Sequence, residues 1–236
     1  MPRGNRIVFA GVPHHVTQRG NRRERVFFRE SDYSAYLAWL KQYTREHAVD
    51  VLAYCLMPNH VHLVVVPDTQ DALNHALRPL HMRYAQSVNR ARGWKGHLWQ
   101  GRYFASALDE GHLWAAIRYV ERNPVRARLV DAADCYPWSS ASAHCGLWGD
   151  PVLSEDPGWR RKLEQIGNWS RWLSDADDTR CLQTLRHQVV KGLPCGSDAF
   201  IDDLEMRCGR RLRSRRPGRP ATQHAPACAE SRPGSK

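Results

Sequence analysis

Two histidines with one valine between them, His60 and His62, open the apolar segment 60–66. In a β-strand, alternate residues face the same side of the sheet, so the two imidazoles share a face about 6–7 Å apart at the backbone. Imidazoles at that spacing can converge on one divalent cation. Two core histidines with satisfied hydrogen bonds are the alternative, and the spacing alone does not separate the two interpretations.

A second pair of side chains could complete such a site. Tyr119 and Asn123 are four residues apart in an expected helix over residues 110–123, which places them on one helix face. The amide oxygen of Asn123 suits a hard ion such as Mg²⁺ or Mn²⁺, and the phenol of Tyr119 is a potential nucleophile. Taken alone, the two are better explained as a core tyrosine and a helix cap.

The elements that must position these residues follow from the hydrophobic pattern. Alternating or continuous apolar residues predict strands, and apolar residues every three or four positions predict helices. The predicted strands cover residues 12–18, 49–57, 60–66 and 101–109, and the predicted helices cover about 31–47, 71–92 and 110–123. The last helix is expected to stop at Pro124, because the residue before a proline avoids the helical conformation.

The connection between two of these strands sets the fold class. Segments 49–57 and 60–66 are joined only by Pro58 and Asn59, so they must form an antiparallel hairpin. The order of elements is that of two split β-α-β units. It predicts an α+β fold with a ferredoxin-like antiparallel sheet (β-α-β-β-α-β-α) and helices on one face.

Sequence character divides the chain into three parts. Residues 1–148 contain the predicted sheet domain. Segment 147–159, LWGDPVLSEDPGW, is typical of a linker, and residues 149–208 are expected to form a small helical extension. Residues 209–236 are rich in Arg and Pro and are predicted to be a disordered basic tail.

The charge balance narrows the class of partner. The 35 Lys and Arg residues against 24 Asp and Glu give a formal net charge of +11, which favours a nucleic acid over a membrane. No segment approaches the ~20 apolar residues of a membrane span, and the start lacks the apolar region of a signal peptide. The seven cysteines form no C-x-x-C pair, so we expect a cytoplasmic, nucleoid-associated protein with reduced thiols.

Arginines near the predicted strand and helix ends are candidates for phosphate contacts. Arginine-rich loops can follow a nucleic-acid backbone and stack on unpaired bases, although a solvated basic surface is the alternative for each of them. The DNA-binding candidates are Arg19, Arg22, Arg23, Arg25, Arg102, Arg118, Arg122 and Arg126.

Four motifs occur in a fixed order along the chain. They are MPNHVHLVVVP (57–67), LWQGRYFAS (98–106), IRYVERNPVRARLV (117–130) and YPWSSASAH (136–144). Together they resemble the REP-associated branch of the single-tyrosine HUH transposases, the IS200-like group, in which HUH denotes two histidines around a hydrophobic residue. The resemblance covers about residues 1–148, and it continues weakly in VVKGLPCGSDAFIDDLE (189–205).

This resemblance implies a function for the residues described above. It implies that residues 1–148 are a catalytic domain that cleaves single-stranded DNA and transfers the strand, with Tyr119 as the nucleophile of a 5′-phosphotyrosine intermediate. His60, His62 and Asn123 would hold a divalent metal ion, Mg²⁺ or Mn²⁺. The implied substrate is a palindromic hairpin of REP type with a flanking single-stranded segment.

Three other functions are weighed against this one. A catalytically silent DNA-binding regulator derived from a transposase is disfavoured by the presence of His60, His62 and Tyr119. An RNA-recognition domain would carry aromatic residues on its central strands, where this chain has histidines and valines. A replication initiator or relaxase is disfavoured by the sequence around Tyr119. Self-association is left open.

Overall fold

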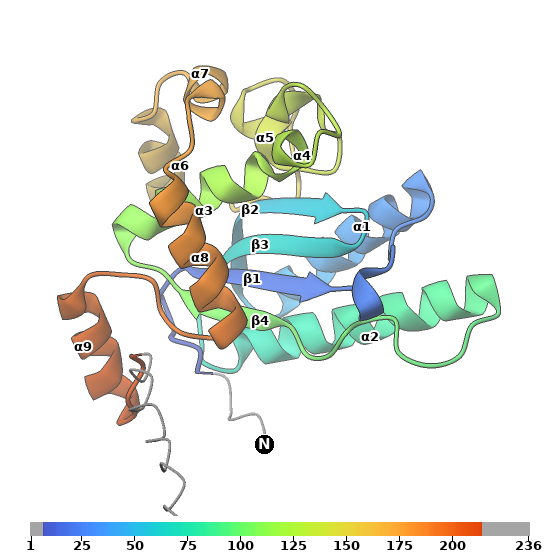
Figure 1. Cartoon of the computed structure of the whole chain (residues 1–236), viewed down its shortest axis with the longest axis horizontal. Coiled ribbons are helices and arrows are strands. Elements are labelled where there is room, and N and C mark those ends of the chain that lie inside the picture. The colour runs from blue at the N-terminus through green and yellow to red at the C-terminus, as the bar shows by residue number, and fades with distance from the viewer. Residues whose placement is uncertain (1–6, 214–236) are drawn as a thin grey trace, which may run out of the picture.

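The computed structural model describes residues 7–213 of the 236-residue chain. The strands are β1 (His14–Arg19), β2 (Val49–Met57), β3 (His60–Pro67) and β4 (Phe104–Ala107). They form one antiparallel sheet in the order β2-β3-β1-β4 (Figure 1). The longer helices of the first half are α1 (Glu30–Glu46), α2 (Ala72–Arg92) and α3 (Glu110–Glu121). The predicted order β-α-β-β-α-β-α is confirmed.

The β2–β3 hairpin fixes the register on which the site depends. Its turn residues are held from outside, since Gly20 N donates to Asn59 O at 2.9 Å and Val26 N donates to Pro58 O at 2.8 Å. In the β1–β3 ladder, Thr17 lies opposite His62 and Arg19 lies opposite His60. Because paired residues of an antiparallel ladder share a face, these four side chains lie on the same side of the sheet.

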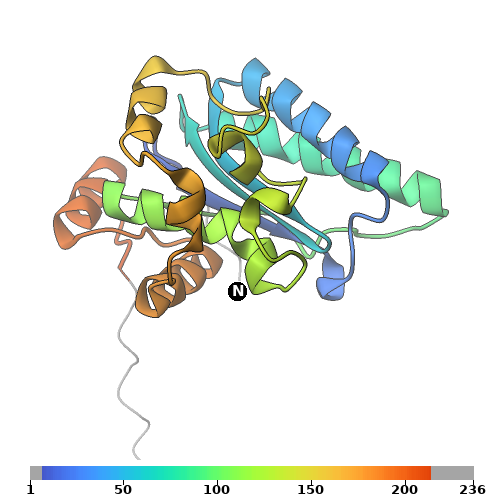
Figure 2. The same ribbon diagram turned by 90° about the horizontal axis from the view of Figure 1, so that it is seen from above.

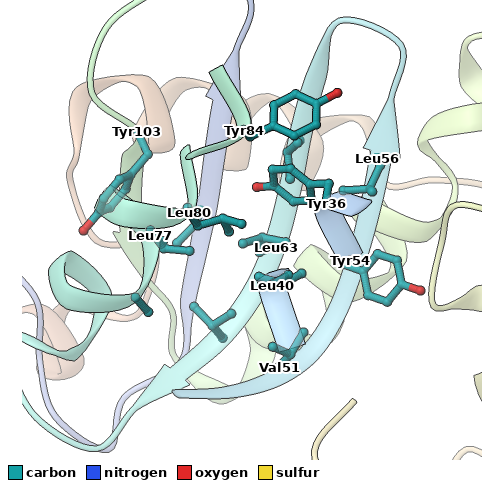
Figure 3. Close-up of a cluster of buried hydrophobic side chains, with 14 of the residues drawn as sticks. Tyr36, Leu40, Val51, Tyr54, Leu56, Leu63, Leu77, Leu80, Tyr84 and Tyr103 are labelled. Atoms are coloured by element: carbon teal, nitrogen blue, oxygen red, sulfur yellow. The ribbon is translucent and has the colours of Figure 1, made fainter. Parts of the chain in front are cut away.

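Helices α1 and α2 cover one face of the sheet, as predicted. In Figure 3, Leu40 of α1 and the pair Leu77 and Leu80 of α2 gather around Leu63 of β3. All four side chains are fully buried. This face therefore forms the main apolar core.

The prediction of helices on one face only is wrong for the third helix. Helix α3 packs on the opposite face of the sheet together with α8 (Thr179–Lys191), so the sheet lies between two helical layers (Figures 1 and 2). The reason is that β2 and β3 are apolar on both faces: Leu52, Cys55 and Val64 point away from α1 and α2 and are also buried. If that second face stayed in water, the free energy gained by burying its apolar side chains would be lost.

The chain stays helical beyond the expected stop at Pro124. Helix α3 ends at Glu121, and a further turn, α4 (Asn123–Arg126), follows after a single residue. A proline in the first turn of a helix is tolerated because its missing N–H would have no helical partner there. Strand β4 is shorter than predicted, since only residues 104–107 pair with β1.

The second half of the chain consists of short helices, as expected. They are α5 (Ala141–His144), α6 (Pro157–Glu164), α7 (Trp169–Ser174), α8 and α9 (Asp198–Cys208), and two 3₁₀ turns, η1 (Asn21–Arg23) and η2 (Ala133–Cys135), complete the structure.

The expected linker and the start of the expected tail are both packed against the rest of the protein. In segment 147–159, Asp150 accepts a hydrogen bond from the Tyr54 hydroxyl at 2.6 Å, and Ser154 N donates to Val51 O at 2.8 Å. The segment therefore follows strand β2. After α9, Leu212 is buried and Arg213 forms an ion pair with Asp202 at 2.7 Å. The predicted tail thus begins as ordered chain, and residues 214–236 lie outside the described part.

Helix α8 joins the C-terminal extension to the sheet. It packs against β4 and α3, and its Leu185 is fully buried in the cluster that includes Leu52 and Val64. In residues 7–213, no helix combines the length and apolar character that a membrane crossing would require.

This packing predicts a stability effect within one helix. Leu185→Ala is expected to reduce the free energy of unfolding by about 2–5 kcal/mol, because it opens a cavity in a fully buried position. The control is Val190→Ala on the same helix, where the side chain is 60% exposed and the change should stay within about 0.5 kcal/mol. Urea unfolding of the full chain measures both values. Equal stability of the two variants would show that α8 does not share the core of the sheet domain.

Candidate active site

The histidine pair of β3 lies on the face that α3 covers. The ring centroids of His60 and His62 are 4.8 Å apart, and the rings are nearly perpendicular. His60 is half-buried, and its Nδ1 lies 2.6 Å from Asn59 Oδ1. Asn59 is held by its own amide, which donates to Arg23 O at 2.9 Å. Since an amide oxygen only accepts, His60 carries its proton on Nδ1 and presents a lone pair at Nε2.

A third histidine joins the pair from the neighbouring strand. His15 of β1 is fully buried, and its Nε2 lies 2.9 Å from His62 Nδ1, with the two rings stacked at 5.1 Å. His15 was not among the site residues predicted from the sequence. The sequence does show that His15 and Thr17, as alternate residues of a predicted strand, share a face of the sheet. That pattern does not say which strand β1 pairs with, so it could not place His15 beside His62. The adjacent His14 faces the other side, where its Nδ1 meets Val12 O at 2.7 Å.

Tyr119 of α3 lies over these histidines. Its ring meets His62 and His15 edge-on, with centroid separations of 5.4 and 5.7 Å. Helix α3 is fixed at its start by the Asp109 carboxylate, which accepts from His112 N at 2.9 Å. A tyrosine two helical turns downstream is thereby carried to the middle of the sheet face. Tyr119 is 7% exposed, so its ring is largely buried against the imidazoles.

Two arginines flank the tyrosine ring. The Arg126 guanidinium lies 4.4 Å from the ring centroid and donates to the Tyr119 carbonyl, and the Arg186 guanidinium of α8 lies 5.5 Å from the same ring. Two positive charges therefore lie beside the Tyr119 ring. Arg186 was not among the candidates drawn from the sequence, because only the packing of α8 brings it to this site.

All three histidines are in their neutral form at pH 7. Burial lowers the pKa of both His15 and His60 to about 4, and the charge of Arg19 contributes at His60. Burial, followed by the neighbouring His60 and His15, lowers the pKa of His62 well below 6.5. Neutral imidazole is the form that coordinates metal ions, and acidification through these lowered values would remove that capacity.

Asn123 is at the start of α4 and is half-buried. Its Nδ2 is enclosed and lacks a hydrogen-bond partner among the described residues. An amide in this condition is available to a ligand from outside the chain, since buried polar groups are normally paired.

Three of the candidate DNA-binding arginines converge on one carboxylate. Asp177, in the loop between α7 and α8, lies 3.8 Å from Arg118 Nε, 3.1 Å from Arg122 Nε and 3.6 Å from Arg126 Nη1. Arg118 also donates to Asp175 O, and Arg122 donates to Leu173 O. The C-terminal extension therefore orders this arginine group, which runs from α3 into α4.

The other candidate arginines lie apart from that group. Arg19 ends β1 opposite His60 and is half-buried. Arg22 and Arg23 are exposed in η1, where both have left-handed backbone with φ of 52° and 63°, and Arg25 follows them on the surface. Arg102 is exposed in the loop before β4. Arg19 and η1 thus border the end of the hairpin that bears His60.

The donor atoms fit a divalent cation bound by few protein ligands. In the described range, no group of three or more His, Cys, Asp or Glu side chains is arranged to hold a metal. His62 Nε2, however, is buried without a hydrogen-bond partner, and His60 presents a lone pair at Nε2. The two imidazole nitrogens suit an ion that takes its remaining ligands from a substrate phosphate or water, whereas the unpartnered atom of Asn123 is the amide nitrogen, a hydrogen-bond donor.

The fold and the site together define a class of protein: an α+β domain in which a central hairpin presents two histidines beneath a helical tyrosine. Residues 9–123 match the family model described as "Transposase IS200 like". Over these residues the chain is similar to the IS200-like transposase family.

Two relatives illustrate the similarity. A Haemophilus influenzae protein, named as a candidate REP-associated tyrosine transposase, is 25% identical over an alignment of 113 residues, which covers 42% of this chain and 63% of the relative. The chain thus spans less than two thirds of that protein. A solved structure of a REP-associated tyrosine transposase bound to a REP hairpin superposes with a TM-score of 0.52 at 20% identity, over 66% of this chain and 93% of the other. It supports the α+β fold.

Proposed function

We propose that this protein is a metal-dependent, single-strand-specific DNA endonuclease and strand transferase that acts on hairpin DNA of REP type. The observation that carries this proposal is the position of Tyr119, whose ring meets the rings of His62 and His15 on a shared, enclosed face. A nucleophile and two neutral imidazoles with available lone pairs are the groups that such a cleavage needs.

The cleavage step is a transesterification at phosphorus. The Tyr119 oxygen forms a bond to phosphorus, the bond from phosphorus to the 3′ oxygen breaks, and the 3′ oxygen leaves as a hydroxyl after taking up a proton. The phenol gives its proton to water, and the 3′ oxygen takes a proton from water, while the Arg126 guanidinium lies 4.4 Å from the centroid of the ring that carries the developing charge. Because one phosphodiester replaces another, a 3′ hydroxyl can later reverse the step without an external energy source.

Three side chains would hold the metal ion. His60 and His62 would bind through Nε2, and Asn123 through its amide oxygen. The ion, Mg²⁺ or Mn²⁺, would polarise the scissile phosphate and stabilise the charge that develops on its non-bridging oxygens.

The substrate class follows from charge and from the relatives. The relative of known structure is bound to a REP hairpin, and the net charge of +11 here suits a polyanion. Arg19 and the exposed arginines of η1 border the His60 end of the hairpin, where a phosphate backbone entering the site would pass. A catalytically silent DNA-binding regulator is the second candidate function, because the exposed arginines of η1 can contact a phosphate backbone whether or not Tyr119 cleaves it.

A single assay separates these two functions. The protein is incubated with 5′- or 3′-labelled hairpin DNA carrying a single-stranded flank, with Mn²⁺, with Mg²⁺ or with EDTA. The endonuclease is expected to form a denaturation-resistant adduct with the 5′ end of the fragment downstream of the cut, which keeps the 3′ label, only when a divalent ion is present. Tight binding without adduct under every metal condition would establish the regulator instead.

Residues 214–236, the part of the predicted basic tail outside the described structure, provide a further prediction. This segment contains four arginines and one lysine against one glutamate, so its removal is expected to weaken hairpin binding. Each lost phosphate contact should flatten the salt dependence by about 0.7 log units per log salt on single strands. The deletion begins after Arg213, so it keeps the Arg213–Asp202 ion pair. Binding titrations at several salt concentrations measure the slope, and identical slopes would mean that the segment does not contact DNA.

A further inference from the structure

The contact between His15 and His62 joins two neighbouring strands beneath Tyr119. β1 lies between β3 and β4, so His15 belongs to the centre of the sheet. It is paired with Val64, which makes it the diagonal neighbour of His62 on the same face. The stacked rings are both buried, at 0% and 3% exposure, and the distance of 2.9 Å between Nε2 and Nδ1 requires a proton between them.

That proton can sit on either ring, and the two arrangements have different consequences. If His62 donates from Nδ1, its Nε2 keeps a lone pair and His15 carries its proton on Nδ1. If His15 donates from Nε2, His62 must carry its proton on Nε2 and cannot bind a cation there. His15 Nδ1 and His62 Nε2 are both buried and lack hydrogen-bond partners among the described residues, so each arrangement leaves one buried N–H unsatisfied.

A cation bound at His62 Nε2 would make these two proton arrangements unequal. It requires the arrangement in which His62 donates and His15 accepts, because a nitrogen that carries a proton has no lone pair to share. We propose that His15 is a positioning residue for the metal site: as the hydrogen-bond acceptor for His62 Nδ1–H, it fixes both the tautomer and the ring orientation of His62. This inference rests on the proposed function, since it concerns the ligand role of His62.

The hydrogen bond between His60 and Asn59 supports the same role for His15. Asn59 Oδ1 accepts from His60 Nδ1 at 2.6 Å, so each histidine of the pair has its own acceptor behind it. Partners of this kind orient metal-binding histidines, and their loss weakens metal affinity by about 10–100-fold. The Asn59 oxygen can only accept, whereas His15 Nε2 can either accept or carry a proton and donate, so a substitution at position 15 tests which role it plays.

Two substitutions of His15 separate positioning from packing. His15→Gln keeps an oxygen that can accept near the place of Nε2, whereas His15→Leu fills similar space with no acceptor. The dissociation constant of Mn²⁺, measured from the EPR signal of the free ion, is expected to rise about 10–100-fold for His15→Leu and to stay within a few-fold of the original protein for His15→Gln. If the two variants bind Mn²⁺ equally well, His15 only fills space and the inference is overturned.

A measurement on the unaltered protein avoids any loss of folding in the variants. Long-range ¹H–¹⁵N spectra of the Mg²⁺-saturated protein are expected to show His62 protonated on Nδ1, and a proton on His62 Nε2 under saturation would overturn the inference. His62→Ala distinguishes a failure of the proposed metal site from a failure of the inference about His15. If this variant keeps the Mn²⁺ affinity of the original protein, the proposed metal site itself fails, whereas an unchanged affinity in His15→Leu alone leaves that site intact.

Discussion

Tyr119→Phe is expected to abolish the covalent protein–DNA adduct and to reduce hairpin cleavage by at least about 10³-fold. The substitution removes a single oxygen from a side chain that is 7% exposed, so the aromatic contacts with His62 and His15 persist. Folding and hairpin binding should therefore remain close to those of the original protein. Denaturing gels of the labelled adduct, run beside binding titrations on the same hairpin, measure the two effects separately.

Tyr103→Phe is the matched control. Tyr103 is also a buried tyrosine, but it precedes β4 and lies with the core of the α1 and α2 face, as Figure 3 shows. This variant should form the adduct at the original rate. An adduct that survives in Tyr119→Phe but disappears in Tyr103→Phe would assign the nucleophile to Tyr103 and remove the main support for the proposed site.

His62→Ala and His60→Ala are each expected to abolish cleavage and to weaken Mn²⁺ binding, whereas EDTA should abolish cleavage by the original protein. His60 presents an Nε2 lone pair on the face that holds Tyr119, and His62 does so when its Nδ1 donates to His15, so each substitution removes a proposed ligand. Hairpin binding should change little, because most of the binding energy of such complexes comes from phosphate contacts elsewhere. Cleavage rates and Mn²⁺ titrations on the same preparations measure the two effects.

The control for these variants is His75→Ala. His75 is exposed on α2, on the other side of the sheet, and its replacement should leave both cleavage and Mn²⁺ affinity unchanged. Full cleavage by His62→Ala, or full activity of the original protein in EDTA, would return the histidine pair to a structural role.

The secondary structure around the site was largely predictable because its signals are local. Strand β2 begins and ends where predicted, at Val49 and Met57, and β3 opens at His60 as expected. A two-residue turn leaves no alternative to an antiparallel hairpin, and the side-chain period of a strand then places His60 and His62 on one face. The helical period similarly predicted α2 and the helix that carries Tyr119.

The layers of the fold were not predictable in the same way. Strand periodicity says which residues share a face, but it does not say which helix covers that face. Burial of Leu52 and Val64 away from α1 and α2 is what draws α3 and α8 to the second side of the sheet. The segment expected to be a linker also packs along β2, because Tyr54 and Val51 supply hydrogen-bond partners that no local pattern reveals.

The sequence by itself determined the chemistry of the site: two imidazoles on one strand face, a tyrosine on a helix, and a basic chain suited to a polyanion. These follow from residue types at fixed spacing, because the backbone geometry of a strand or helix sets the direction in which each side chain points. Only the tertiary structure decided what surrounds them. The contact of His15 with His62 and that of Asp177 with three arginines join residues separated by 47 positions or more. Such contacts depend on strand order and on the packing of α8, and both arise only when the apolar faces of all the elements are buried together.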